Sequence, residues 1–195
     1  MWAIFWVSFG LLWVIVAIQS FAFLELLRQI GQIRQQLGPR QGALIMKDAV
    51  NTGGPLPELT GLSAVDLRPA RWDDYLGKAF SVVVALTTRC NSCKLIAEEL
   101  TGFAGELGDA ISIAVLVEGS VDEVANFLTA TRLSPRMVII DEDGITTKRF
   151  GINWNPGAVT IWGRKLGEAA IVNDVDQINA LIEAKAGRLE NAVSR

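Results

Sequence analysis

The chain has 195 residues, half of them hydrophobic, with 18 basic and 21 acidic side chains and a formal net charge of −3. This length suits one domain with an appendage, and the slightly acidic balance gives no reason to expect a nucleic-acid partner. The sequence has no histidine and two cysteines, which excludes histidine-based acid–base catalysis and histidine metal sites. It shows no phosphate-binding glycine loop and no internal repeat.

The first 24 residues carry no charged side chain. As a helix, Trp2–Leu24 would be about 35 Å long, enough to cross a hydrocarbon core of about 30 Å. A cleaved signal peptide is disfavoured, because no basic segment precedes the apolar run and no small-residue cleavage site follows it. We therefore predict that residues 1–24 are a retained transmembrane anchor, with Trp2 and Trp6 at the membrane interface.

Residues 25–38 continue with apolar residues three to four apart and polar residues between them, which predicts an amphipathic helical stalk. The stalk is either a spacer or a contact helix for a membrane partner, and amphipathicity alone does not separate the two roles. Residues 39–58 are rich in glycine and proline and are predicted to be a linker. Residues 59–187 are then the folded domain, and residues 188–195 a flexible tail.

The basic residues Arg28, Arg34, Arg40 and Lys47 follow the predicted span, and none precedes it. The positive-inside rule therefore places the folded domain in the cytoplasm. However, three or four basic residues on one side of the span, without a strong signal on the other side, determine the orientation only weakly.

The central stretch is Ser81–Leu100, SVVVALTTRCNSCKLIAEEL. Its apolar run Val82–Leu86 predicts a buried strand, and the apolar residues from Cys93 onward recur at helical spacing. Cys90 and Cys93 stand between the two, as a Cys-x-x-Cys at a helix start. This arrangement is typical of the redox site of thioredoxin-like folds.

Disulfide exchange explains why both cysteines belong at this position. At a helix N-terminus, free backbone N–H groups and the helix dipole favour the thiolate of Cys90, which is the nucleophile. Arg89 and Lys94 add positive charge beside it. Cys93, one turn further on, is placed to attack the mixed disulfide on Cys90 and release the product. The redox group would be the Cys90–Cys93 disulfide itself, with no other cofactor and no metal.

Three other interpretations of the cysteine pair stay open. A structural disulfide would close so short a loop that little entropic stabilisation results. A zinc site needs about four ligands, and the chain has no further cysteine and no histidine, so a second molecule would have to supply the rest. The third interpretation is a chance pair, or the relic of a site that has lost its redox chemistry.

The remaining elements follow from apolar periodicity and capping residues. Strands are predicted within Leu59–Leu67 and at Ile111–Val117, Met137–Asp141, Ala158–Trp162 and Leu166–Val172. Helices are predicted at Trp72–Leu76, after Ser120 with a capping box to Glu123, at Gly144–Phe150 as a short helix or turn, and after Asp174. Strands alternating with helices, closed by a hairpin and a helix, predict an α/β fold with a thioredoxin-like mixed sheet flanked by helices.

Asn155-Pro156 directly precedes one of these strands. The proline is either an ordinary trans residue or part of a cis peptide bond opposite the cysteine pair, and the thioredoxin-like context favours cis. A cis turn would expose the backbone of Asn155, which could then pair with an extended protein substrate. Trp154 and Thr88 are candidates for the border of the same groove, although each could equally be a packing residue.

The segments RCNSCK, IIDEDGITTKRFGINWNPGAVTIW and GRKLGEAAIVNDVDQINALI resemble the thioredoxin pattern, and Ile111–Thr131 resembles the insertion of its TlpA-like branch. LELLRQIGQIRQQLGPRQGALIMKDAVNTGGPLPEL is similar to the anchor, stalk and entry segment of MauD-type proteins, accessory proteins of methylamine utilisation. The resemblance implies a membrane-anchored thiol–disulfide oxidoreductase that acts on protein disulfides or dithiols outside the cytoplasm, in the periplasm or at the cell exterior. It also implies a role in maturing a disulfide-containing enzyme, beside a multi-spanning membrane electron carrier. Members of this family carry similar basic residues after the span and are nonetheless expected to face outward. We therefore predict that the folded domain lies on the extracytoplasmic side of the membrane.

The sequence departs from these families at three places. Arg89 stands where TlpA-like proteins usually have tryptophan, and Asn91-Ser92 replaces the proline usual in MauD-type proteins. Val84 stands where thioredoxins often bury an acid, so that deprotonation of Cys93 lacks an obvious local base. The alternative function is therefore a redox-inactive thioredoxin-fold scaffold, or an assembly subunit of a membrane complex.

Overall fold

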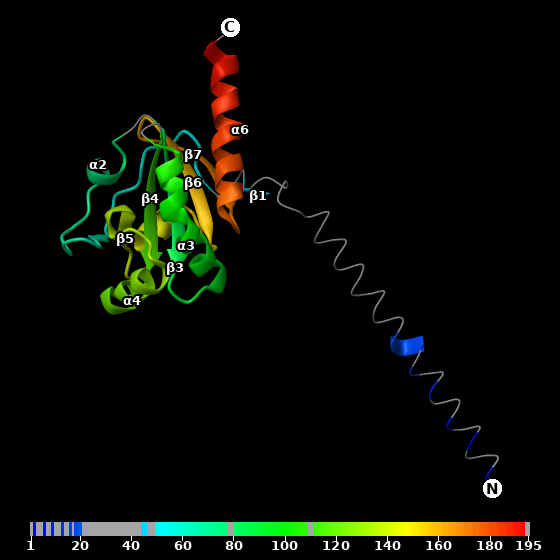
Figure 1. Cartoon of the computed structure of the whole chain (residues 1–195). Helices are drawn as coiled ribbons and strands as arrows, with labels where there is room; N and C mark the ends of the chain where they lie inside the picture. The colour runs from blue at the N-terminus through cyan, green and yellow to red at the C-terminus, as the bar shows by residue number, and fades with distance from the viewer. Residues whose placement is uncertain are drawn as a thin grey trace. The chain divides into compact units, whose positions relative to one another are not determined.

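The computed structural model describes Trp2, Trp6, Phe9, Trp13, Val16 and residues 18–20, 44–46, 50–77, 80–108 and 111–193. The chain divides into two units, Met1–Gln41 and Gly42–Arg195. The second unit carries the β-sheet and both cysteines (Figure 1). Its start at Gly42 lies well before residue 59, where the sequence predicts the folded domain to begin.

In the first unit, the described residues are helical. Trp2, Trp6, Phe9 and Trp13 are spaced three to four apart and so share one side of the helix. The ring of Phe9 meets those of Trp6 and Trp13 edge-on, with 6.2 Å between centroids in each pair. Most of the predicted anchor and all of the predicted stalk lie outside the described residues. Within the part of the chain that is described, no helix is both long enough and apolar enough to cross a membrane.

The elements of the second unit match the order predicted from residue 59 onward, with bounds that differ by a few residues. In chain order they are β1 (Leu44–Ile45), β2 (Leu62–Ser63), α2 (Trp72–Tyr75), β3 (Phe80–Thr87), α3 (Asn91–Glu106), β4 (Ile111–Glu118), α4 (Val121–Thr131), the 3₁₀ helix η1 (Pro135–Met137), β5 (Val138–Ile140), α5 (Ile145–Arg149), β6 (Gly157–Trp162), β7 (Lys165–Ile171) and α6 (Val175–Val193).

The strands form a seven-stranded mixed sheet in the order β1-β7-β6-β3-β4-β5-β2. β3 lies at its centre, parallel to β4 and antiparallel to β6. The parallel pairs β3–β4 and β4–β5 are joined through α3 and α4, as crossover connections require. β6 and β7 form an antiparallel hairpin. This order places the end of β3, where the cysteine motif begins, in the middle of the sheet.

One face of the sheet is covered by α3, α4 and α6, and α3 contacts the other two (Figure 1). The β3 residues that point to this face are Phe80, Val82, Val84 and Leu86, of which the last three are 0% exposed. Because side chains alternate along a strand, the intervening residues point to the opposite face. A mixed sheet buried on both faces is therefore what the near-continuous apolar run of β3 predicts.

The opposite face is covered by α2, α5 and the segment that leads into α2. Trp72 from α2 and Phe150 at the end of α5 pack there, with ring centroids 5.6 Å apart in an edge-on contact. Val83 and Ala85 of β3 contribute the sheet side of this layer. The two apolar layers hold β3 rigidly, because it is packed on both faces and paired on both edges.

The structure differs from the sequence prediction over residues 39–58, which are expected to be a linker. β1 lies in this segment and pairs antiparallel with β7, and Val50 is buried in the core. The N–H of Gly53 donates to the carbonyl of Leu166 at 2.7 Å, and the N–H of Leu166 donates to the carbonyl of Gly54 at 2.9 Å. The outer backbone groups of β7 would otherwise form an unpaired sheet edge, so this segment covers it.

The starts of α4 and α6 are capped by the side chains that the sequence predicts. The Ser120 hydroxyl accepts from the N–H of Glu123 at 3.4 Å, while the Glu123 carboxylate accepts from the N–H of Ser120 at 2.9 Å. At α6, the Asp174 carboxylate accepts from the N–H of Gln177 at 2.8 Å. These side chains satisfy backbone donors that a helix start leaves unpaired.

Residues 188–195 are predicted to be a flexible tail, whereas α6 extends into this segment. The helix continues to Val193. Apart from Gly187 itself, the residues from Ala184 to Ala192 are mostly good helix formers, and one glycine costs a helix only about 1 kcal/mol relative to alanine. Their combined preference therefore outweighs the glycine.

The substitution Ser120→Ala should lower the free energy of unfolding by about 1 kcal/mol, because it removes the acceptor for the N–H of Glu123. Urea unfolding followed by circular dichroism measures the change. Ser134→Ala is the matched control, since Ser134 is the N-cap of η1 but its side chain makes no capping hydrogen bond. An equal loss in both variants would contradict the role of the Ser120 hydroxyl.

Candidate redox site

The cysteine pair lies where the central strand meets its helix. β3 ends at Thr87, and Cys90 is the N-cap of α3 with an extended backbone (φ −103°, ψ 124°). The Sγ of Cys90 accepts a hydrogen bond from the N–H of Cys93 at 3.3 Å. Unpaired N–H groups and the helix dipole favour negative charge at such a position. The fold thus gives the Cys90 sulfur the environment of a helix-capping acceptor.

Both thiols are free, and they differ in accessibility. Cys90 is half-buried, whereas Cys93 is 0% exposed and belongs to the apolar layer beneath α3. Burial, together with the neighbouring Cys90 side chain, raises the pKa of Cys93 to about 12. Cys90 is therefore the sulfur that a reaction partner can reach, and Cys93 stays a protonated thiol at neutral pH.

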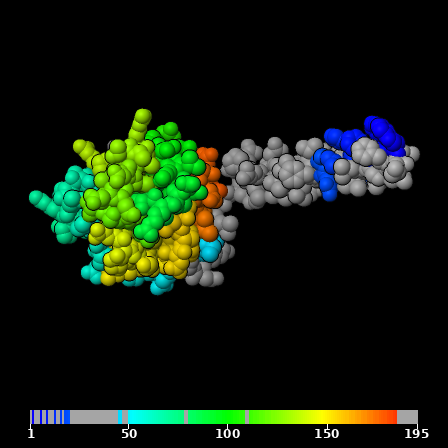
Figure 2. Space-filling model, turned by 90° about the horizontal axis from the view of Figure 1, so that it is seen from below, coloured from blue at the N-terminus to red at the C-terminus, as the bar shows by residue number. Residues whose placement is uncertain are grey.

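A proline loop lies beside the same end of β3. The Asn155–Pro156 peptide bond is cis, and the next residue, Gly157, pairs with Ala85 of β3. In the orientation that satisfies both groups, the side-chain nitrogen of Asn155 donates to the carbonyl of Ala85 at 3.3 Å. Because β3 and β6 are antiparallel, the loop lies alongside the segment that leads to Cys90. In Figure 2 the green surface around residue 100 borders the yellow surface around residue 150.

Thr88 and Trp154, the two predicted border residues, have different surroundings. Thr88 follows β3, and its N–H donates to the carbonyl of Glu118 at 3.2 Å. Its Oγ1 is buried and has no hydrogen-bond partner among the described residues. The Nε1 of Trp154 donates to the carbonyl of Ala170 at 3.5 Å, and its ring lies so close to Gly157 that an added Cβ there would be 3.1 Å from Nε1. Trp154 thus packs against β6 and β7, while Thr88 stays next to the cysteine turn.

The two predicted cations, Arg89 and Lys94, are both exposed. Hydrogen bonds from Ser120 lower the pKa of the Glu123 carboxylate, and the charge of Arg89 adds to the effect. Arg89 therefore acts on a carboxylate of α4 as well as standing next to Cys90. Sequence reasoning missed this partner, because only the fold brings α4 to the cysteine turn.

Sequence reasoning also passed over Leu95, whose side chain is 62% exposed on the first turns of α3. The signal was available, because Leu95 falls outside the helical set of buried residues that includes Cys93, Ile96 and Ala97. A large exposed apolar side chain this close to the cysteine pair offers a contact for an apolar side chain of a reaction partner.

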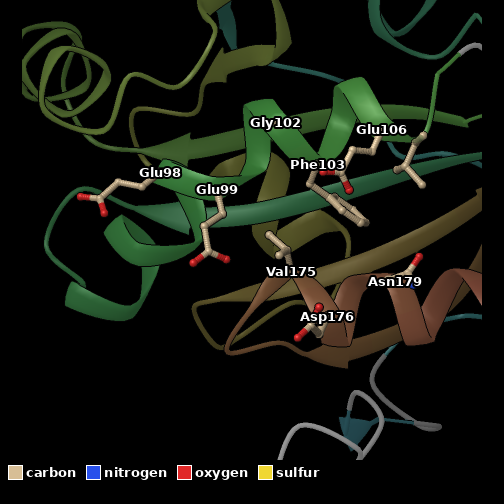
Figure 3. Close-up of a pocket in the computed structure, with 9 residues that line it drawn as sticks. Glu98, Glu99, Gly102, Phe103, Glu106, Val175, Asp176 and Asn179 are labelled. Atoms are coloured by element: carbon tan, nitrogen blue, oxygen red, sulfur yellow. The ribbon is translucent and has the colours of Figure 1, made fainter.

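A second hollow, of about 600 Å³, lies between α3 and α6 (Figure 3). Phe103 and Val175 give it an apolar part, and carboxylates of both helices line its rim. Among the described residues, no three or more histidine, cysteine, aspartate or glutamate side chains are arranged to hold a metal ion. Neither cysteine lines the hollow, so the candidate redox site is the cysteine pair beside the proline loop.

No protein-family model matches the sequence, and no curated protein matches it either. Solved structures do match. A secreted Mycobacterium tuberculosis disulfide oxidoreductase homologous to E. coli DsbE is 19% identical, with a TM-score of 0.51 over 63% of this chain and 94% of that one. The thioredoxin domain of a Bacteroides vulgatus thiol-disulfide oxidoreductase is 14% identical, with a TM-score of 0.58 over 69% and 97%. A domain of a possible thiol-disulfide isomerase from Cytophaga hutchinsonii is 12% identical, with a TM-score of 0.59 over 74% and 99%.

These likenesses confirm the predicted fold class: the second unit has a thioredoxin-like fold. At such low sequence identity they show the fold alone. The MauD-type resemblance of the N-terminal segment finds no counterpart among the structures named above.

Iodoacetamide should modify Cys90 in the folded, reduced protein and leave Cys93 unmodified. The difference follows from the burial and high pKa of Cys93, since the thiolate is the reactive form. We expect Cys90 in the Cys93→Ser variant to react at least about a hundredfold faster than Cys93 in the Cys90→Ser variant. Mass spectrometry of the peptides measures both rates. Similar rates in the folded variants would contradict the assignment, whereas similar rates in urea are expected.

Proposed function

We propose that the protein is a thiol–disulfide oxidoreductase that exchanges its Cys90–Cys93 pair with disulfides or dithiols of other proteins. The observation that carries the proposal is the placement of Cys90 as the half-buried N-cap of α3, with its Sγ bonded to the N–H of Cys93. This is the sulfur environment that disulfide exchange requires. The similar structures described as disulfide oxidoreductases agree with the proposal and support it through the fold.

In the reductive direction, the Cys90 thiolate attacks one sulfur of a client disulfide, and the other client sulfur leaves as a thiolate. A disulfide now joins Cys90 to the client. The Cys93 thiolate then attacks the Sγ of Cys90, and the client's first sulfur leaves with its electron pair. The client has gained two electrons, and the cysteine pair, now a disulfide, has lost them. The reverse sequence oxidises a client dithiol, and the disulfide serves as the redox group without a further cofactor.

The client binds across the cysteine turn and the proline loop. The carbonyl of Pro156 accepts a hydrogen bond from the N–H of Val172 at 3.4 Å. In the orientation described above, the side-chain nitrogen of Asn155 donates to the carbonyl of Ala85. Hydrogen bonds to the sheet therefore fix the position of the loop. The backbone of Asn155 pairs with an extended client segment. Leu95, on the exposed side of α3, contacts an apolar client side chain.

The protein works outside the cytoplasm, on a membrane anchor formed by residues 1–24. The charge-free N-terminal sequence and the MauD-type resemblance support this part of the proposal. The resemblance further supports a role in maturing a disulfide-containing partner enzyme and a membrane electron carrier as redox partner. The basic residues after the span argue for the opposite orientation.

Reporter fusions at the C-terminus test the orientation. We expect an alkaline phosphatase fusion to be active, because this enzyme needs disulfides that form outside the cytoplasm, and a green fluorescent protein fusion to stay dark. Membrane fractionation of the same cells tests the anchor. Inactive phosphatase together with a fluorescent fusion would contradict the extracytoplasmic placement.

The cysteine variants test the chemistry. Cys90→Ser should lower the rate at which the protein reduces model disulfides, such as those of insulin, at least about a hundredfold, because the nucleophile is lost. Cys93→Ser should accumulate a Cys90–client disulfide, visible on non-reducing gels. Glu106→Gln, on the rim of the second hollow, is the control and should retain the wild-type rate. Full turnover by Cys90→Ser would contradict the proposal and favour the redox-inactive scaffold.

A further inference from the structure

The second half of the proposed exchange needs the Cys93 thiolate, so the proton on Cys93 has to leave. Cys93 is 0% exposed, one turn into α3, with its side chain in the apolar layer beneath the helix. The side chain is thus buried in the reduced protein, before Cys90 has bonded to a client. What takes the proton therefore depends on the groups that face it.

The apolar side chains packed around Cys93 come from β3–β7, α3, α4 and α6. Among the described residues, Asp141 is the one buried carboxylate. On β3 the residues facing this layer are Phe80, Val82, Val84 and Leu86. Among the described residues, Cys90 is the ionisable side chain whose hydrogen bond and charge act on Cys93, and Cys90 is bonded to the client when the proton must leave.

The elements around Cys93 carry Glu98, Glu99, Glu106, Asp122, Lys165 and Glu183, which are exposed, and Glu168, which is half-buried. Seven further charged groups lie on or next to these elements: Arg89, Lys94, Glu118, Glu123, Asp141, Asp174 and Asp176. Arg89 and Lys94 are exposed cations and accept no proton. Glu123 and Asp174 cap the starts of their helices. Asp141 accepts from two backbone N–H groups at the start of α5. Of the two that remain, Asp176 is exposed and the side chain of Glu118 lies against the turn before α5.

We propose that hydroxide from solvent takes the Cys93 proton in place of a buried base, so that the Cys90–client disulfide persists at neutral pH and resolves faster as the pH rises. The inference rests on the proposed function, since it concerns the second half of that exchange. In the step, hydroxide removes the proton and becomes water. The Cys93 thiolate then attacks the Sγ of Cys90, and the client sulfur leaves with the electron pair of the broken S–S bond.

The pKa of Cys93 agrees with this inference. Burial is the largest cause of its rise to about 12 in the reduced protein. Below its pKa, the thiolate fraction of a thiol rises about tenfold with each pH unit. A site without an internal base should therefore show no plateau in its resolution rate across the neutral range.

The test follows the reduced full-length protein as it reacts with the disulfide of dithiobis(nitrobenzoate), which releases coloured thionitrobenzoate. The first equivalent reports attack by Cys90, and the second reports resolution by Cys93. We expect the second rate to rise about tenfold per pH unit between about pH 6 and about pH 9. A plateau with a midpoint below about pH 8 would reveal an internal base and overturn the inference.

A pair of variants at Val84, which is fully buried on the Cys93 face of β3, tests the missing base directly. Val84→Asp supplies a carboxylate and should raise the second rate at about pH 7 at least tenfold and flatten the pH profile. Val84→Asn has a similar shape without a base and should keep the wild-type slope. Circular dichroism checks that both variants fold, and the wild-type profile decides alone if they do not.

The two proposals fail in different ways. If the folded protein releases no first equivalent, Cys90 is not the nucleophile, and the proposed function falls together with this inference. If the first equivalent is released and the second rate is independent of pH, the proposed function stands and this inference falls. A folded Val84→Asp variant with the rate and slope of Val84→Asn would also contradict the inference.

Discussion

The hydrogen bond from the N–H of Cys93 to the Sγ of Cys90 joins the chemistry of the site to the start of α3. It forms because β3 ends at Thr87 and the short turn after it brings Cys90 to the N-cap. A capping sulfur faces donors that the helix cannot satisfy by itself. The geometry holds only while α3 stays seated on the sheet, which depends on the burial of Ile96 and Leu100.

The sheet order then decides what stands next to that sulfur. Asn155 is far from Cys90 along the chain, and the two segments approach because β6 pairs antiparallel with the centre of β3. β7 holds the other side of the proline loop and is itself covered by β1. The position of the proline loop beside the cysteine turn is thus a product of strand pairing across the whole sheet.

Much of this architecture could be predicted from local patterns. Alternating and continuous apolar runs indicated the strands, the capping box of Ser120 and the carboxylate of Asp174 marked helix starts, and Cys-x-x-Cys after a strand indicated the fold. Two-residue β1 carries no periodicity, so its segment looked like a linker. The influence of Arg89 on Glu123 and the packing of Trp154 could not be predicted, because each depends on contacts between segments distant in sequence.

Val84, which helps to stabilise the core, also bears on the chemistry proposed for Cys93. Burying a side chain such as Val84 contributes about 1.5–3 kcal/mol to folding, whereas a carboxylate at the same place would have to be desolvated among aliphatic neighbours at a cost of several kcal/mol. The apolar choice seats α3 firmly and keeps Cys93 out of solvent. A carboxylate at position 84 could therefore supply a proton acceptor for Cys93 only by giving up part of the packing that seats the helix carrying both cysteines.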